Sequence, residues 1–166
     1  NGTATVTDSK VTASSGPSST AFYVNNANDL IISNSVLNIT SGNNGLYTAG
    51  GNIQIDNSQI VINAGGNPIN TSDSDDTAGN LTITGANTVI EAKGAYPIFG
   101  NTIEIREAAV SANASSGTAM SANRDITIAD GADVTVHTDA KMAAIYSIAG
   151  NILLDGKETK IDATSE

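Results

Sequence analysis

Asn52 to Gly65, with the sequence NIQIDNSQIVINAG, contains two short runs in which apolar and polar residues alternate, joined by a polar corner. The apolar residues are Ile53 and Ile55 in the first run and Ile60 and Ile62 in the second. Alternation with a period of two is typical of β-strands that bury one face. The stretch therefore predicts two strands that bury isoleucine on the same side.

The same unit recurs along the whole chain. The first apolar residue of each copy is followed two positions later by another apolar residue, and these first residues lie 22 to 28 positions apart. They are Ala4, Leu30, Ile53, Leu81, Ile103, Ile126 and Ile152. Such alternation within a unit of this length is typical of a β-solenoid, in which each coil buries its inner face by stacking on its neighbours.

A second alternating run begins seven residues after each first apolar residue, and only the sixth copy begins it one residue later, at Val134. In the fourth and seventh copies this spacing places Thr88 and Thr159 at the first inward position of the run. A third apolar patch precedes the next copy. We therefore predict an all-β, single-domain, right-handed parallel β-helix over residues 1–166, with about seven coils and three short strands per coil.

Composition limits the classes of partner. The formal net charge is −10, and a chain with only seven Lys and Arg residues lacks the basic surface that nucleic acid or an anionic membrane requires. Cysteine is absent, so neither a disulfide nor a thiolate nucleophile is expected. No apolar stretch reaches the length of a membrane span, and we expect no signal peptide within residues 1–166. We expect a fragment of a longer, extracellular or cell-surface bacterial protein.

Aromatic side chains concentrate in one part of the repeat. The chain has four tyrosines and two phenylalanines, and all of them fall in the third segment of their coils. They are Phe22, Tyr23, Tyr47, Tyr96, Phe99 and Tyr146. Rings on an outer face would contact the apolar faces of sugars, whereas rings at a wide corner would fill the core. We favour core filling for the set, and we expect Tyr23, Tyr47 and Tyr146 to be the exposed, carbohydrate-binding members.

Two further groups of polar residues are candidate binding features. Asp73, Asp75 and Asp76 lie in a polar loop over residues 70–77, and such an oxygen-rich segment suits Ca²⁺, although a solvated acidic loop is the alternative. One residue before each first apolar position lies a polar residue that stacking would align into a ladder. These residues are Asp29, Asn52, Asn80, Thr102, Asp125 and Asn151. We favour a structural ladder over one that faces sugar.

Catalytic patterns are weak, and we expect no enzymatic activity. His137 occupies an outward strand position without a nearby Ser/Asp pattern, so we interpret it as a surface residue. Arg106 and Arg124 occupy different positions of the repeat and would not stack, and we expect Arg106 to form a surface ion pair with a neighbouring glutamate. The outward positions of the first strand supply no pair of carboxylates for glycoside hydrolysis.

Three units of the form Gly-Asn-apolar-x-apolar resemble the repetitive surface proteins of Gram-positive and gut bacteria: Gly51–Ile55, Gly79–Ile83 and Gly150–Leu154. The segment Ala21–Ala27 resembles a turn in the calcium-bearing, carbohydrate-binding β-helix family of clostridial surface proteins. That resemblance implies a fold similar to that of polysaccharide lyases, with binding of acidic or cellulosic polysaccharide and no confirmed catalysis. The family's acidic calcium positions match Asp73, Asp75 and Asp76 loosely.

Three hypotheses for function follow. The first is a non-catalytic extracellular module that binds polysaccharide or cell-wall glycan, or that acts as an adhesin. The second is a structural stalk that spaces other domains, and the third is a degenerate or partial polysaccharide lyase. An exposed row of tyrosines would favour the first, and fully buried aromatics the second. Open strand edges at the terminal coils would also allow end-to-end self-association.

Overall fold

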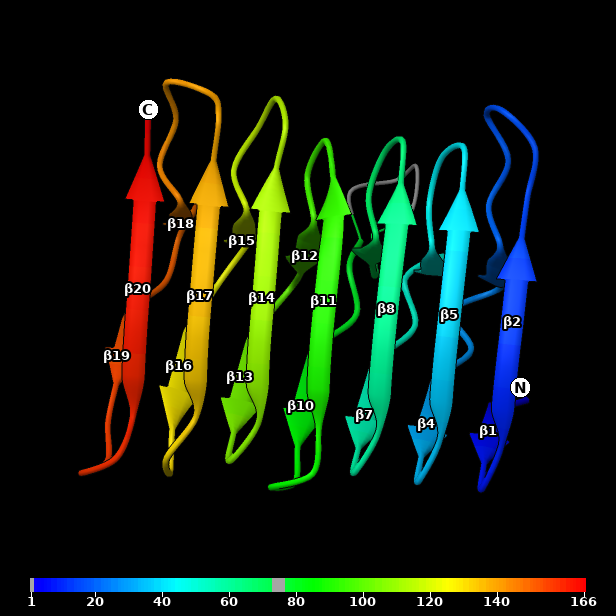
Figure 1. The fold of residues 1–166 in the computed structure, drawn as a ribbon, viewed down its shortest axis with the longest axis horizontal. Coiled ribbons are helices and arrows are strands. Elements are labelled where there is room, and N and C mark those ends of the chain that lie inside the picture. The colour runs from blue at the N-terminus through cyan, green and yellow to red at the C-terminus, as the bar shows by residue number, and fades with distance from the viewer. Residues whose placement is uncertain (1, 73–76) are drawn as a thin grey trace.

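The computed structural model describes residues 2–72 and 77–166, and these residues form 20 strands and no helix. The chain winds into successive coils that stack along the long axis of the molecule, from the N-terminal coil to the C-terminal coil (Figure 1). Equivalent strands of successive coils form three sheets, and all pairings between these strands are parallel. The prediction of an all-β parallel β-helix with three short strands per coil is confirmed.

Each sheet collects one strand position of the repeat, and the three sheets are named A, B and C in the order in which the chain visits them. Sheet A contains β1 (Ala4–Thr7), β4 (Leu30–Ser33), β7 (Ile53–Asp56), β10 (Leu81–Thr84), β13 (Ile103–Arg106), β16 (Ile126–Ala129) and β19 (Ile152–Leu154). Sheet B contains β2 (Lys10–Ser14), β5 (Val36–Ser41), β8 (Gln59–Ala64), β11 (Val89–Gly94), β14 (Ala109–Ala114), β17 (Asp133–Thr138) and β20 (Lys160–Ser165). Sheet C contains β3 (Phe22–Val24), β6 (Leu46–Thr48), β9 (Ile69–Asn70), β12 (Ile98–Gly100), β15 (Met120–Ala122) and β18 (Ile145–Ser147).

The core is a single cluster of stacked aliphatic side chains contributed by all three sheets. In the middle coils the inward residues are almost completely buried, as Ile53, Ile60 and Ile69 of the third coil show. Burying a side chain of this size contributes roughly 1.5–3 kcal/mol. At the two ends the same positions are more open: Ala4 is half-buried and Ile152 is exposed. Among the described residues, no helix has the length and apolar composition needed to cross a membrane.

In three coils glycine is required at the corner between sheet C and the next strand of sheet A, because successive backbones touch there. A Cβ atom on Gly51 would lie 1.9 Å from the carbonyl oxygen of Asn28, and one on Gly79 would lie 2.0 Å from the carbonyl oxygen of Gly51. A Cβ on Gly150 would lie 2.4 Å from the carbonyl carbon of Arg124. This close approach explains the glycine of the Gly-Asn-apolar units.

A ladder of hydroxyl groups satisfies the backbone at the corner between sheets A and B. The backbone N–H of Ser9 donates to Ser35 Oγ at 3.1 Å, that of Ser35 to Ser58 Oγ at 3.1 Å, and that of Ser58 to Thr88 Oγ1 at 3.3 Å. The hydroxyl of Ser58 in turn donates to the carbonyl oxygen of Asp56 at 2.8 Å. Backbone groups that the corner removes from the sheets therefore keep hydrogen-bond partners.

The expected spacing between the first two strands is correct in most coils and wrong in two. Ile60 pairs with Ile90 rather than with Thr88, so the fourth coil has two extra residues at this corner. Val134 pairs with Ile161 rather than with Thr159, which gives the seventh coil the same insertion. A slip of two residues keeps every side chain on its own face, so the hydrophobic pattern could not reveal it. The one-residue extension before Val134 in the sixth coil is confirmed.

The polar loop of the third coil is shorter than expected at its N-terminal end. Asn70 belongs to β9, and Thr71 is buried with its hydroxyl donating to the carbonyl oxygen of Gly79 at 2.7 Å. Ser72 and Ala78 form an isolated antiparallel bridge across the base of the loop. Residues 73–76 lie outside the described part of the chain.

Replacement of Gly79 by alanine tests the close contact between coils. Because the added methyl group would lie 2.0 Å from a backbone oxygen and 2.7 Å from the backbone nitrogen of Asn52, the free energy of unfolding should fall by about 1–3 kcal/mol. Gly16→Ala is the matched control, since nothing lies within 4 Å of its added Cβ, and its effect should stay within about 0.5 kcal/mol. Urea denaturation measures both, and equal effects would contradict this account of the corner.

Candidate functional site

One outward row of sheet C brings together most of the aromatic residues. Strand pairing places Tyr23 beside Tyr47, Tyr47 beside Asn70, Asn70 beside Phe99, and the row continues through the next two coils. Its members in chain order are Tyr23, Tyr47, Asn70, Phe99, Ser121 and Tyr146. We call this set the aromatic row. All three tyrosines expected to bind carbohydrate therefore occupy one position of the repeat.

The expectation that the aromatics as a set fill the core is wrong. Phe22 points inward and packs against the hydrophobic cluster. Tyr23 and Tyr146 are 56% and 48% exposed, and Tyr47 and Phe99 are half-buried on the outer face. The physical reason is the parity of the strand: Phe22 pairs with the inward Leu46, so the next residue must point outward. The core position is instead filled by aliphatic residues such as Ile69 and Ile98.

Tyr23 and Tyr47 stack on each other. Their ring centroids are 5.2 Å apart and their planes are inclined by 12°. The Tyr23 hydroxyl donates to Asn25 Oδ1 at 3.0 Å, which fixes the ring edge. Each ring therefore covers one face of the other, and the remaining face of Tyr23 together with the hydroxyl edges is what the pair presents to a ligand.

The aromatic row is interrupted at its third member. Asn70 is only 7% exposed, and its Oδ1 accepts hydrogen bonds from the Ser72 backbone N–H at 2.9 Å and from the Ser72 hydroxyl at 2.7 Å. The row thus has a part formed by Tyr23 and Tyr47 and a second part that includes Phe99 and Tyr146.

The polar ladder before sheet A is structural, as expected. Asp29 Oδ1 accepts from the backbone N–H of Asn52 at 2.8 Å and from its Nδ2 at 2.9 Å, and Asn52 Oδ1 accepts from the backbone N–H of Asn80 at 2.8 Å. Asp125 Oδ1 accepts the backbone N–H of Asn151 at 2.7 Å in the same way. These oxygens are engaged with the coil stacked against them, which explains the carboxylate or amide at Asp29, Asn52 and Asp125.

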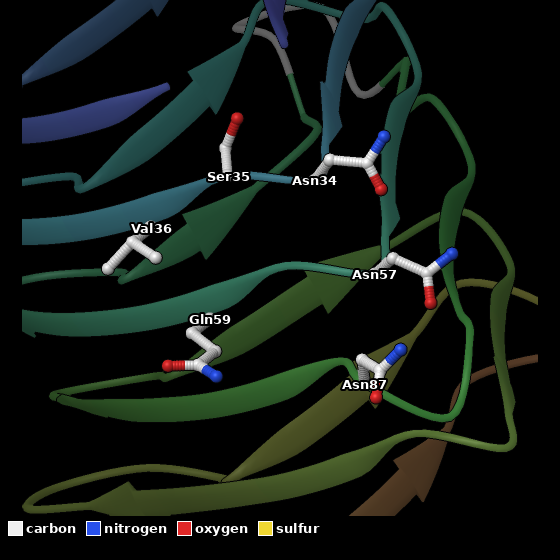
Figure 2. Close-up of a pocket in the computed structure, with 6 residues that line it drawn as sticks. All are labelled: Asn34, Ser35, Val36, Asn57, Gln59 and Asn87. Atoms are coloured by element: carbon white, nitrogen blue, oxygen red, sulfur yellow. The ribbon is translucent and has the colours of Figure 1, made fainter. Parts of the chain in front are cut away.

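A second stack of asparagines lines a hollow of about 390 Å³ at the corner between sheets A and B. The sequence pattern did not predict this stack. Figure 2 shows Asn34, Asn57 and Asn87 one above another, with their amide groups pointing to the same side. Asn34 and Asn57 have positive φ angles of 50° and 45°, a backbone conformation that asparagine tolerates better than most residues. Backbone geometry therefore accounts for these two residues.

Arg106 forms the expected ion pair with a neighbouring glutamate. Arg106 contacts the carboxylate of Glu104, and its Nη1 lies 2.5 Å from Asp130 Oδ2 of the next coil. Hydrogen bonds to Glu104 first and to Asp130 second raise the pKa of Arg106 above its ordinary value. Arg106 therefore forms a surface ion pair with Glu104 and Asp130.

His137 lies on the outer face of sheet B, as expected, and it has two polar partners there that the sequence pattern did not reveal. Its Nε2 lies 2.9 Å from Asp139 Oδ1, and its Nδ1 lies 2.8 Å from Thr164 Oγ1 of the next coil. The sequence signal was present as His-x-Asp on one strand face, but Thr164 lies 27 residues away and only stacking brings it near. The calcium candidates Asp73, Asp75 and Asp76 lie outside the described residues, and that expectation stays a prediction.

Comparison of the chain with protein-family models, with curated proteins and with solved structures finds no significant match. The fold therefore stands on the strand pairing of this chain itself.

Replacement of Asn52 by alanine tests the structural role of the ladder. The backbone N–H of Asn80 would lose its side-chain acceptor at an exposed position, so the free energy of unfolding should fall by about 0.5–1.5 kcal/mol. Gln54→Ala, at an exposed position of the same strand, is the control and should change stability by less than about 0.5 kcal/mol. Thermal and urea unfolding measure the difference, and an Asn52 variant as stable as the Gln54 variant would show that the ladder is dispensable.

Proposed function

We propose that this domain is a non-catalytic, extracellular carbohydrate-binding module of a bacterial surface protein and that the aromatic row is its binding face. The observation that carries the proposal is the exposure of Tyr23 and Tyr146 in one register position of the coils. A domain with only 4% aromatic residues places most of them on one outward row, where they contribute little to the core. Exposed aromatic residues with a polar end are suited to ligands that are apolar on one face and polar at their edges.

The surroundings of Tyr23 supply the polar part of such a site. Asn25 receives the Tyr23 hydroxyl, and its Oδ1 also accepts the backbone N–H of Asn26 at 2.8 Å. Asn25 and Asn26 are exposed, so amide donors and acceptors lie beside the ring. A sugar needs this combination, because its apolar face packs on a ring and its hydroxyl groups form hydrogen bonds with amides.

Charge favours an uncharged glycan as the ligand. The chain has a formal net charge of −10, so a polyanionic polysaccharide would be repelled at long range unless a cation bridged the two. A neutral polysaccharide meets no such repulsion.

A structural stalk is the second candidate, and the side-chain ladders favour it. Hydrogen bonds from Asp29 through Asn52 to Asn80, and from Ser9 through Ser35 to Ser58, connect successive coils on two different corners. Such connections stiffen a rod whether or not it binds a ligand. A lyase-like function gains no support from Arg106, whose guanidinium is already engaged by two carboxylates.

A glycan array probed with the whole domain tests the proposal, first with calcium and then with a chelator. We expect binding to a neutral polysaccharide, and about a tenfold or greater loss of affinity in Tyr23→Ala and in Tyr146→Ala, because each removes an exposed ring of the row. Tyr96→Ala is the matched control, since Tyr96 is 45% exposed but lies outside the row, against Gly117.

Absence of binding to every glycan under both conditions would favour the stalk. If Tyr96→Ala weakens binding as much as Tyr23→Ala does, the binding site lies outside the aromatic row. Unfolding curves of all three variants show whether any loss of affinity comes from loss of fold.

A further inference from the structure

Three side chains that can ligate a metal meet at one end of sheet B. His137 lies on β17 and Asp139 follows its last residue, two positions further on, where the backbone N–H of Asp139 still donates to the carbonyl oxygen of Ala114, so both side chains point outward. The backbone N–H of Glu166 donates to the carbonyl oxygen of Thr138 at 3.2 Å, which continues the pairing of β17 with β20 and sets Glu166 beside Asp139. One ligand atom from each of the three residues lies within 4.8 Å of the other two.

The imidazole of His137 is held in place from both sides. Thr164 Oγ1 lies 2.8 Å from Nδ1, and Asp139 Oδ1 lies 2.9 Å from Nε2. A hydrogen bond on one ring nitrogen fixes the ring orientation and leaves the other nitrogen directed at the carboxylates. A metal-ligating histidine commonly donates its second ring N–H to an oxygen acceptor, and Thr164 Oγ1 would be that acceptor here.

We propose that His137, Asp139 and Glu166 form a surface site for a divalent transition-metal cation of the Zn²⁺ type. One imidazole nitrogen and two carboxylate oxygens suit Zn²⁺, and water would complete the coordination. Imidazole distinguishes such a cation from Ca²⁺ and Mg²⁺, which prefer oxygen ligands alone. Bonds of about 2.0–2.2 Å to zinc place the ligand atoms roughly 3.5 Å apart. His137 Nε2 and Asp139 Oδ1, now 2.9 Å apart, would separate slightly, and the Glu166 carboxylate, within 4.8 Å of both, would approach, which is a small movement for the exposed side chains of Asp139 and Glu166.

The alternative chemistry for Thr164, His137 and Asp139 is that of a hydrolytic catalytic triad, with a nucleophile, a base and an acid. Such a triad needs backbone donors to stabilise an oxyanion next to the nucleophile. Thr164 lies within the extended strand β20, where successive backbone N–H groups point to opposite sides and do not converge on one oxyanion. The second carboxylate, from Glu166, favours a cation instead.

Titration of the full 166-residue chain with zinc chloride, followed by calorimetry, tests the site. We expect one site in the unaltered chain and at least a tenfold loss of affinity in His137→Gln and in Glu166→Gln, each of which removes one ligand. Thr164→Val should weaken binding by about 10- to 100-fold, because it removes the hydrogen bond that orients the imidazole. Asp162→Asn is the control: this exposed carboxylate lies on the same strand, opposite Thr135, and its loss should leave affinity unchanged.

Magnesium and calcium chloride are the comparison probes and should bind more weakly than zinc. Zinc should also raise the melting temperature of the unaltered chain but not that of His137→Gln, because a ligand that binds only the folded state stabilises it. The proposal is overturned if zinc does not bind, if His137→Gln binds as tightly as Asp162→Asn, or if all three cations bind equally well. Circular dichroism of each variant shows that the coils remain intact.

Discussion

Parallel stacking of equivalent residues, about 4.8 Å apart from one coil to the next, is the constraint on which the rest of the structure depends. It makes every position of the repeat a row that runs along the molecule. An inward row becomes the isoleucine core, and a corner row becomes a ladder of side-chain hydrogen bonds such as that through Asn52 and Asn80. An outward row becomes a surface on which the same kind of side chain can recur, as Tyr23 and Tyr47 do. Structure and candidate function therefore arise from the same register.

Most of the fold could be predicted from the sequence. The backbone of a β-strand fixes the period of two in the apolar residues, and the length of one coil fixes the length of the repeat. The three-strand coil and the inward faces followed directly. What the sequence could not supply was the length of individual corners, since insertion of two residues before Ile90 leaves the alternation unchanged. Thr88 was expected in the core, but it lies in the hydroxyl ladder at this corner, where its Oγ1 accepts the backbone N–H of Ser58. Gly85, with a φ of 91°, begins that longer corner.

The candidate sites divide in the same manner. Tyr23, Tyr47 and Tyr146 could be predicted to face outward because each follows an inward residue on its strand, although Tyr47 is half-buried and the aromatics as a set were expected in the core. The group formed by His137, Asp139 and Glu166 could not be predicted from the local sequence, because its third member comes from the next coil. Likewise, His137 has Thr164, 27 positions away, as a partner only because the coils stack. Function in such a fold therefore has to be sought along rows rather than along the chain.

Disulfide trapping tests the register most directly, since the chain has no cysteine of its own. The structure pairs Val61 with Glu91, whereas the simple repeat of the sequence would pair Val61 with Val89. Neighbours in register have Cα atoms about 5 Å apart, within the range a disulfide spans, and neighbours displaced by two residues are about 8 Å apart, outside it. Oxidation of the Val61→Cys/Glu91→Cys chain should give a rapid intramolecular disulfide, and the Val61→Cys/Val89→Cys chain should stay reduced. The opposite result would contradict the stacking on which the core, the ladders and both proposed sites depend.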